Sequence, residues 1–212
     1  MPGDVPLKGA LILAGGKSTR FGGNKSLAEL AGKPLIVHVF QTAALAAGEI
    51  VVAIGTEGSV DVYKKLLPSS VRLVKDRFLV KSPLVGIVTG FQAMKSEYSV
   101  VLSCDTPFVK EDVLRLLFKK AVRSDAAIPK WPNGDIEPLQ SVYRVSSAIP
   151  AAKQALSRRE FRNVDMIRRL DRVTYVPVRE IKRVDADLAT FFNVNSRSDL
   201  RRAKAFFSSS SG

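Results

Sequence analysis

Short apolar runs alternate with helical patterns through the first half of this 212-residue chain, and this alternation most constrains its fold. Runs rich in β-branched residues predict strands at 10–14, 49–55, 71–76 and 98–105. Spacing typical of helices occurs at 34–48, 60–67, 83–95 and 111–123. Strands that alternate with helices favour a parallel sheet covered on both faces. We therefore predict an α/β fold with a mostly parallel, Rossmann-like sheet flanked by helices.

The second half is less regular and continues without a long linker or an internal repeat. It predicts strands at 126–130, 137–144, 173–178 and 191–195, and helices at 146–158, 163–170 and 196–207. Ser196 is the expected N-cap of the last helix, and Asp199 completes an acidic variant of the capping box. We expect one domain over residues 1–207, followed by a frayed tail at 208–212.

Composition favours a folded protein of a reducing compartment. The chain is 46% hydrophobic, which argues against disorder, and its one cysteine, Cys104, excludes an intramolecular disulfide. The opening residues lack a cationic start followed by an uninterrupted apolar run. The most membrane-like window, 35–55, is interrupted by His38, Gln41 and Glu49, so it predicts a core helix and a strand. We expect a cytoplasmic protein.

The net charge of +13 indicates an affinity for anions without naming them. A basic chain suits nucleic acid, but its cations are scattered, with local clusters at 157–162, 166–172 and 199–204. They are not accompanied by an aromatic-rich strand pair, a zinc motif or a helix-turn-helix. Anionic small molecules and a plain solvated surface are the two main interpretations, with a nucleic-acid-binding protein as a remote alternative.

The segment 11–25, "LILAGGKSTRFGGNK", follows the first predicted strand and is dense in glycine and cations. A Walker loop needs a glycine five positions before Gly16, where this chain has Leu11. The glycines also miss the spacing of the dinucleotide fingerprint. Three cations nevertheless follow the first glycines: Lys17, Arg20 and Lys25. Backbone amides at glycines and nearby cations favour an anion-binding loop over a passive turn.

Several motifs occur in a fixed order along the chain. They are "LAGGKSTRFGGNK" (13–25) with "GKPL" (32–35), "SPLVG" (82–86), "CDTPF" (104–108) and "FNVN" (192–195). Together they resemble the nucleotidyltransferases of glycosyltransferase-A-like fold, and among these most the molybdenum cofactor guanylyltransferases. The resemblance covers most of the chain, and the last two motifs are the more characteristic of that family. It implies transfer of GMP from GTP to molybdopterin, with release of pyrophosphate.

The resemblance assigns the nucleotide to the first half of the chain, about 9–108. Lys25 would contact the α-phosphate, Arg20 would hold the β- and γ-phosphates, and Asp105 would be the Mg²⁺ ligand, which makes these three the expected catalytic residues. Further nucleotide contacts are implied for Leu13, Ala14, Gly15, Gly16, Asp76 and Gly86. Such transfers depend mainly on positioning and charge neutralisation, and Mg²⁺ usually takes only one or two carboxylates.

The second half, about 109–195, is expected to bind the acceptor, molybdopterin. Asn195 would complete the metal site, although it is equally placed to cap the next helix, and Asn193 would contact the acceptor. Arg158 and Arg159 are expected partners of the acceptor phosphate. Two anionic substrates would account for the positive charge. Molybdoenzymes or cofactor-biosynthesis proteins are the protein partners that the resemblance implies.

Three positions depart from the family pattern. Ser82 stands where glycine is usual, Asn24 stands where Asp often precedes the lysine, and Ala53 aligns with a polar position that contacts the nucleotide, with Thr56 as a nearby substitute. The change at Ala53 concerns base recognition. A cytidylyltransferase acting on the same cofactor and a guanylyltransferase acting on a cobamide precursor therefore remain alternatives. An inactive nucleotide-binding regulator is a third, which retention of the catalytic residues opposes.

Three conspicuous side chains are given structural roles. His38, the only histidine, lies in an apolar helical pattern and is expected to be packed or partly exposed there. Cys104 should point away from Asp105 and join the core. Trp131 is expected to cover the core from a loop, with stacking on the pterin as its alternative.

Overall fold

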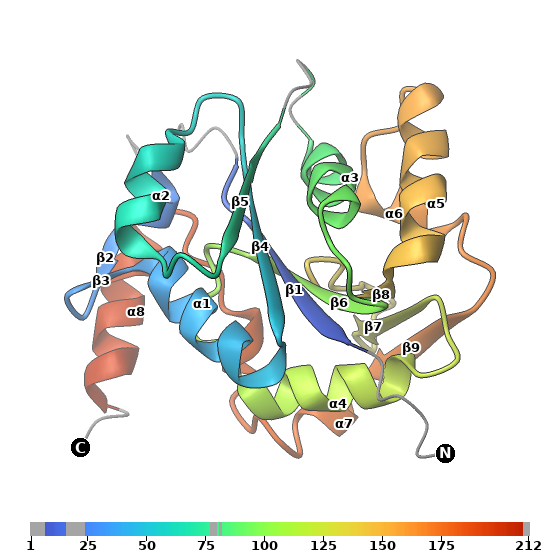
Figure 1. Cartoon of the computed structure of the whole chain (residues 1–212). Coiled ribbons are helices and arrows are strands. Elements are labelled where there is room, and N and C mark those ends of the chain that lie inside the picture. The colour runs from blue at the N-terminus through green and yellow to red at the C-terminus, as the bar shows by residue number, and fades with distance from the viewer. Residues whose placement is uncertain (1–6, 16–23, 77–79, 81, 210–212) are drawn as a thin grey trace, which may run out of the picture.

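A seven-stranded sheet forms the centre of the protein, for which a computed structural model describes residues 7–15, 24–76, 80 and 82–209 (Figure 1). The strand order is β5-β4-β1-β6-β8-β7-β9. The strands are β1 (Lys8–Leu13), β4 (Glu49–Ile54), β5 (Arg72–Lys75), β6 (Tyr98–Ser103), β7 (Ala126–Lys130), β8 (Gln140–Arg144) and β9 (Val173–Pro177). Each lies within two residues of a predicted strand, except that β8 begins later than expected.

The sheet is mostly parallel, as predicted. β1 pairs in parallel with β4 and β6, β4 with β5, and β7 with β9. β8 is antiparallel to both of its neighbours, β6 and β7. Six strands therefore run in one direction, and β8 runs against them. The turn that joins β7 to β8 consequently lies at the same edge of the sheet as the carboxyl ends of β1 and β6.

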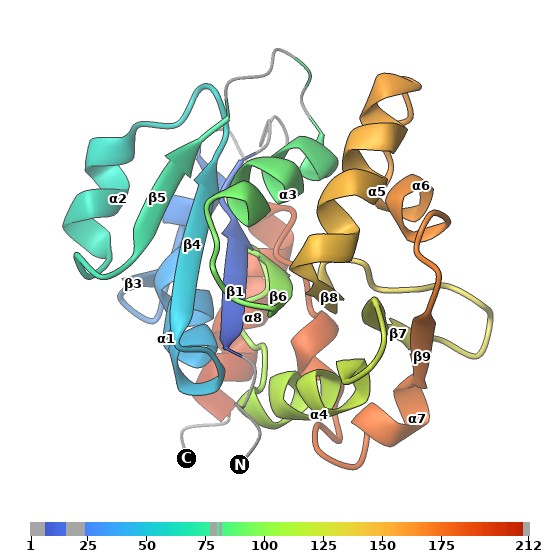
Figure 2. The same cartoon turned by 45° about the vertical axis from the view of Figure 1, so that its right-hand side comes forward.

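Helices cover both faces of the sheet (Figure 2). One face carries α1 (Leu35–Ala46), α2 (Val60–Leu66), α4 (Glu111–Ala121) and α7 (Val178–Ile181). The other carries α3 (Pro83–Gln92), α5 (Val145–Ser157) and α6 (Asn163–Ile167). The alternation of side chains along β1 shows why: Ala10 and Ile12 pack into the first core cluster, whereas Leu11 and Leu13 pack into the second. A strand buried on both faces reads as one continuous apolar run.

A third, smaller cluster lies beside the main sheet and was not predicted. The strands β2 (Glu29–Leu30) and β3 (Lys33–Pro34) form a hairpin against α8 (Arg197–Ser209). Ala31 and Gly32 join the two strands with φ of 49° and 76°, the left-handed conformation that such tight hairpins need. Leu30, Val194 and Ala203 are buried in this cluster. The last helix is thereby attached to the segment that follows Lys25.

The predicted strand at 191–195 is wrong. Its first residue ends a short 3-10 helix, η2 (Ala189–Phe191), and residues 192–195 pair with no described strand. Asn193 Nδ2 donates to the carbonyl of Phe191 at 3.0 Å, so its side chain serves a local turn. Val194 is buried in the third cluster, and its amide donates to the carbonyl of Asp105 at 2.8 Å. One such bond fixes the segment without building a strand.

None of the helices within the described ranges has both the length and the apolar character that crossing a membrane requires.

Candidate functional site

The carboxyl ends of the parallel strands bring the predicted nucleotide-binding residues to one edge of the sheet. Leu13 ends β1, Asp76 directly follows β5, and Asp105 lies in the turn after β6. Backbone bonds continue across this edge, since the amide of Cys104 donates to the carbonyl of Leu13 at 3.2 Å and that of Asp76 to Ile54 at 2.9 Å. Ligands of open α/β sheets bind at this edge.

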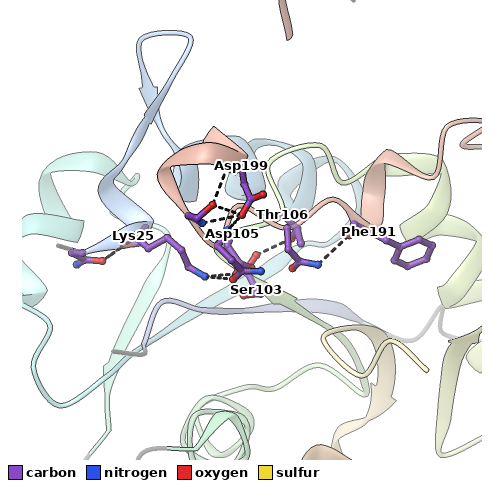
Figure 3. Close-up of polar contacts among 11 residues, drawn as sticks. Lys25, Ser103, Asp105, Thr106, Phe191 and Asp199 are labelled. Carbon is purple, nitrogen blue, oxygen red and sulfur yellow. Dashed lines mark hydrogen bonds and ion pairs between the residues drawn. The ribbon is translucent and has the colours of Figure 1, made fainter. Parts of the chain in front are cut away.

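Lys25 begins the 3-10 helix η1 (Lys25–Leu27), and its ammonium meets two groups from distant parts of the chain (Figure 3). Its Nζ donates to Asp105 Oδ2 at 2.5 Å and to Asn195 Oδ1 at 2.9 Å. The side chains of Lys25 and Asp105 are only 19% and 9% exposed. Such a shielded pair is screened less by water and salt than a surface pair. The structure thus brings three predicted site residues into one polar group, which we call the Lys25 cluster.

A turn after β6 holds the Asp105 carboxylate. Thr106 Oγ1 donates to the carbonyl of Ser103 at 2.9 Å, which closes the turn. The sequence placed Asp105 at the end of the strand, and the structure places it two residues beyond. Asp105 Oδ1 is buried and accepts no hydrogen bond from any residue in the described ranges. A buried, unpartnered carboxylate oxygen costs free energy, so its presence indicates a ligand position.

Asn195 is placed by the capping box of α8. Asp199 Oδ2 accepts from the amides of Asn195 and Ser196 at 3.1 and 2.9 Å and from Ser196 Oγ at 2.8 Å. The amide of Asp199 donates to Ser196 Oγ at 3.1 Å, which confirms the predicted box. The Ser196 hydroxyl, with these amides, holds the pKa of Asp199 below its ordinary value. Ser196, not Asn195, is the cap, so the expected capping role of Asn195 is wrong, and its amide oxygen accepts from Lys25 instead.

The donor set of the Lys25 cluster fits a magnesium ion. Asp105 supplies a buried carboxylate oxygen, Oδ1, that is unoccupied by the described residues, and Asn195 supplies an amide oxygen. In the described part of the chain, no three His, Cys, Asp or Glu side chains gather in a metal-binding group. Mg²⁺ needs few protein ligands when substrate phosphates and water complete its shell, so one carboxylate with one amide is a fitting set.

Asp76 forms a second polar position, against Gly86 of α3. A Cβ built on Gly86 would lie 3.1 Å from Leu13 Cδ2, 3.8 Å from Ala53 Cβ and 3.9 Å from Asp76 Oδ2, so this glycine lets α3 approach the strand ends. Burial raises the pKa of Asp76, although the Thr89 side chain hydrogen-bonds to it. Oδ1 of Asp76 is buried and has no hydrogen-bond partner among the described residues. Its free oxygen suits a ligand that donates hydrogen bonds.

Gly15 has a structural reason that the sequence did not reveal. A Cβ at Gly15 would lie 2.9 Å from the backbone nitrogen of Gly55, closer than real contacts allow. The ends of β1 and β4 therefore approach each other at two glycines. We expected a glycine here to make room for a ligand. The close approach of the Gly55 backbone is enough to require a glycine at this position, with or without a ligand. The predictions for Gly16 and Arg20 fall outside the described residues.

The predicted acceptor residues are not gathered into the Lys25 cluster. Arg158 and Arg159 are exposed at the carboxyl end of α5, and neither guanidinium forms a hydrogen bond or ion pair with another described residue. Ser82 Oγ donates to the carbonyl of Phe161 at 2.7 Å, which places the segment after these arginines beside the start of α3. Asn193 is exposed next to the cluster and bonds to the Phe191 carbonyl.

Two of the departures from the family pattern acquire local functions. Ser82 is the N-cap of α3, where its Oγ accepts from the amide of Leu84 at 3.1 Å. Asn24 is the N-cap of η1, where its Oδ1 accepts from the amide of Ser26 at 3.2 Å. The third, Ala53, is buried against α3.

Sequence reasoning missed two contacts around the site. Trp131 Nε1 donates to Glu137 Oε1 at 2.7 Å, and the Trp131 ring packs edge-on against Phe191 at 5.5 Å. This contact joins the turn between β7 and β8 to the segment that carries Asn193. The second is the hydroxyl of Tyr63, which bonds to residues on both sides of Lys25. A tyrosine in the short predicted helix at 60–67 gave no signal for that position.

The structural roles of two conspicuous residues are confirmed. Cys104 is buried in the first core cluster, and burial raises its pKa to about 12, which excludes a reactive thiolate. His38 is half-buried, and its Nε2 lies 2.8 Å from the carbonyl of Leu30, so it fastens α1 to the small hairpin.

Comparisons with known proteins agree with this geometry. A protein named probable molybdenum cofactor guanylyltransferase from Methanosarcina mazei is 31% identical over 91% of this chain and 88% of its own length. The molybdenum cofactor guanylyltransferase of Desulfosudis oleivorans is 30% identical over 92% of this chain and 93% of its own.

Solved structures give the same result. Molybdopterin-guanine dinucleotide biosynthesis protein A from Archaeoglobus fulgidus superimposes with a TM-score of 0.79 at 27% identity, covering 96% of this chain and 100% of that one. The 2-C-methyl-D-erythritol 4-phosphate cytidylyltransferase of Thermus thermophilus shares the fold, with a TM-score of 0.67 at 16% identity over 93% of this chain and 97% of its own. Residues 10–173 match the family model of the MobA-like NTP transferase domain, and the chain belongs to that family.

Proposed function

We propose that this protein transfers GMP from GTP to molybdopterin or its molybdenum-bound form, which yields the guanine dinucleotide cofactor. The observation that carries this proposal is the Lys25 cluster, where one ammonium lies between Asp105 and Asn195 at the strand edge. A cation and a carboxylate at that place suit a reaction between two polyanions. Relatives of about the same length, about 30% identical, are named for this activity.

The proposed reaction is a substitution at the α-phosphorus of GTP. A terminal phosphate oxygen of molybdopterin forms the new P–O bond, and the bond from the α-phosphorus to the bridging β-oxygen breaks. Pyrophosphate leaves with that electron pair. Lys25 exchanges its carboxylate partner for an α-phosphate oxygen and stabilises the charge that develops there. Arg20, as expected from the sequence, would hold the leaving phosphates.

Magnesium dependence is part of the proposal. Asp105 Oδ1 and Asn195 Oδ1 would hold the ion, which would neutralise charge on the phosphates when bound. Asp105 already pairs with Lys25 through its other oxygen, Oδ2. The same carboxylate would therefore hold the ammonium through Oδ2 until the α-phosphate replaces it, and would hold the metal through Oδ1. This dual role explains why a short side chain in a tight turn carries the position.

Guanine rather than cytosine is proposed as the base, and Asp76 supports this choice. A carboxylate only accepts hydrogen bonds, and the N1–H and 2-amino groups of guanine form a pair of donors. Cytosine offers a single amino donor on its base-pairing edge. The unpartnered Oδ1 of Asp76 beside Gly86 suits the guanine edge. Cytidylyl transfer to the same acceptor and guanylyl transfer to a cobamide precursor are the alternatives.

The acceptor is proposed to bind on the side of β7, β8 and β9. Asn193 lies next to the Lys25 cluster, and Arg158 and Arg159 supply exposed positive charge near the start of α3. The overall charge of +13 would speed the capture of both anionic substrates. A cytoplasmic location and contacts with molybdoenzymes or cofactor-biosynthesis proteins complete the proposal.

One experiment tests the reaction and its substrates together. The protein is incubated with molybdopterin, Mg²⁺ and equimolar GTP, CTP and ATP, and the dinucleotide product is identified by mass spectrometry. We expect a guanine dinucleotide that disappears when Mg²⁺ is chelated and when Lys25 is replaced by Ala. A cytosine product would contradict the assignment of Asp76. If GTP binds but no dinucleotide forms, molybdopterin is not the acceptor, and the cobamide precursor would then be tested.

A further inference from the structure

The hydroxyl of Tyr63 lies beneath the segment that carries Lys25 and has no part in the reaction described above. Tyr63 projects from α2 and is 0% exposed. Its Oη lies 2.7 Å from Ser26 Oγ and 3.3 Å from the carbonyl oxygen of Ala14, and it accepts from Asn24 Nδ2 at 3.1 Å. One buried oxygen thus joins the end of β1 to the residues on both sides of Lys25.

Counting protons shows that these contacts form a closed network. Ser26 Oγ also donates to Asn24 Oδ1, at 2.8 Å. The hydroxyl proton of Tyr63 has two acceptors within reach, Ser26 Oγ and the carbonyl of Ala14. If it goes to Ser26, the three side chains form a ring in which each donates to the next. If it goes to Ala14, Ser26 donates to Tyr63 instead. In both arrangements each polar side chain of the network has a partner.

We propose that Tyr63 is a positioning residue for the Lys25 ammonium, because its hydroxyl fixes Asn24 and Ser26 relative to the end of β1. Lys25 lies between these two residues in sequence, and its backbone follows theirs. Its side chain then needs only to extend to reach Asp105 and Asn195. The far end of the Lys25 segment is packed through Leu27 and the small hairpin, so the Tyr63 network supplies the polar anchor at the near end.

The residue types in the network support this assignment. The Asn24 amide both accepts from Ser26 and donates to Tyr63, whereas an ionised aspartate there could only accept. Burial raises the pKa of Tyr63, so the phenol keeps its proton at neutral pH and remains both donor and acceptor. Packing alone would not need the hydroxyl, since a phenylalanine would fill the same space.

The effect on catalysis rests on the function proposed above, whereas the effect on Lys25 itself does not. Without the hydroxyl, the Lys25 segment keeps its packing and loses its polar anchor. The ammonium should then leave the pair of oxygens more often and meet solvent. It should also meet the α-phosphate of bound GTP less often in the correct geometry, which lowers kcat more than it raises the KM for GTP.

The test compares Tyr63→Phe with Tyr143→Phe. Tyr143 is also 0% exposed, and its hydroxyl donates to one backbone carbonyl, that of Pro138, at 2.9 Å, so it is a matched control for losing a buried hydroxyl. The first measurement is the rate at which an amine-reactive acetylating reagent modifies Lys25, divided by its rate at the exposed Lys153. Mass spectrometry follows both modifications in the absence of substrate. The second is the kcat and KM for GTP, and the third is the melting temperature.

We expect Tyr63→Phe to label Lys25 roughly threefold faster and to lower kcat about tenfold, the size expected for one ordered hydrogen-bonded anchor. Tyr143→Phe should leave the Lys25 labelling rate and kcat near those of the wild type, although its melting temperature should be similar to that of Tyr63→Phe. Ser26→Ala removes another member of the network and should change Lys25 labelling in the same direction, which covers the case that Tyr63→Phe does not fold.

The possible results separate this inference from the proposed function. Equal Lys25 labelling in the wild type, Tyr63→Phe and Ser26→Ala would overturn the positioning role, whatever the enzyme's substrate. If Lys25 labelling rises as expected while the wild-type protein makes no guanine dinucleotide, the positioning role stands and the proposed reaction fails. If the kinetic loss in Tyr63→Phe only parallels a loss of melting temperature that Tyr143→Phe shares, the hydroxyl is structural and the inference is wrong.

Discussion

The two halves of the molecule hold their candidate site residues in different ways. On the side of β5, β4, β1 and β6, Lys25, Asp76 and Asp105 lie directly after strand ends or on a capped turn, and their polar atoms are largely buried. On the side of β8, β7 and β9, Arg158 and Arg159 are exposed beyond a helix end. If the proposed function holds, this difference means that the reacting phosphate is positioned rigidly, whereas the acceptor is attracted mainly by charge.

The largest effect should come from removing the cluster itself. Lys25→Ala and Asp105→Ala should each lower kcat/KM for GTP by roughly 100- to 1,000-fold, because preorganised charge at the transferred phosphate is lost. Steady-state kinetics with GTP and molybdopterin checks this. Lys33→Ala, a substitution of an exposed lysine on β3, serves as the control and should retain activity. A loss below about fivefold in both cluster variants would contradict a rigid nucleotide side.

Asp76→Asn should change base selection by roughly 30-fold, because an amide no longer offers two acceptors to guanine. Competition between GTP and CTP, read as product ratio, checks it. Burial raises the pKa of Asp76, so its charged form destabilises the folded protein above the ordinary carboxyl pKa, and this penalty is absent once pH falls below that value. Asp76→Asn should therefore raise the melting temperature at pH 7 and not at low pH. An unchanged ratio of guanine to cytosine product in Asp76→Asn would mean that other residues recognise the base.

Substitutions at the start of α8 show whether the rigid placement of the Lys25 cluster depends on this last helix. Asp199→Ala removes the bonds to the amides of Asn195 and Ser196, whereas Ser196→Ala weakens the cap and leaves the bond to Asn195. We expect about a tenfold loss of kcat in the first variant and less than about threefold in the second, at comparable melting temperatures. Equal losses in both would show that only helix stability matters.

The smallest effect should come from the acceptor side. Reversing both charges, Arg158→Glu with Arg159→Glu, should raise the KM for molybdopterin about fivefold and leave kcat and the KM for GTP unchanged. The effect should shrink as salt is added. Arg201→Glu with Lys204→Glu on α8 changes the net charge equally and is the matched control. An equal rise in the control would mean that net charge, rather than this helix end, attracts the acceptor.

The sequence predicted the parts of the fold that depend on local patterns. The strand and helix alternation and the capping box at Ser196 and Asp199 follow from short-range rules, and the structure confirms them. Asp105 was predicted to end its strand, whereas it lies two residues beyond the end of β6. The apolar pattern at 191–195 led to the wrong prediction of a strand. Val194 is buried because it packs into the third cluster, which the sequence periodicity does not indicate.

Contacts between distant segments were beyond sequence reasoning. The sequence indicates that Gly15 is a ligand-binding glycine, whereas the structure shows that the neighbouring Gly55 backbone requires it. The Tyr63 hydroxyl reaches Asn24 and Ser26, the neighbours of Lys25, from α2, and this contact depends on tertiary packing alone. The residues proposed to carry the chemistry could therefore be singled out from local motifs, whereas Tyr63, which positions Lys25, could not.

The reversed direction of β8 has a consequence for how this family diversifies. Because residues 131–139 join β7 to β8 without a crossover helix, Trp131 and its neighbours form a hairpin loop at the edge where the parallel strands end. Insertions at a hairpin tip leave strand register and core packing untouched. If the proposed function holds, a change in the length and sequence of this loop could alter the acceptor site while the parallel strands beside the proposed nucleotide site keep their pairing.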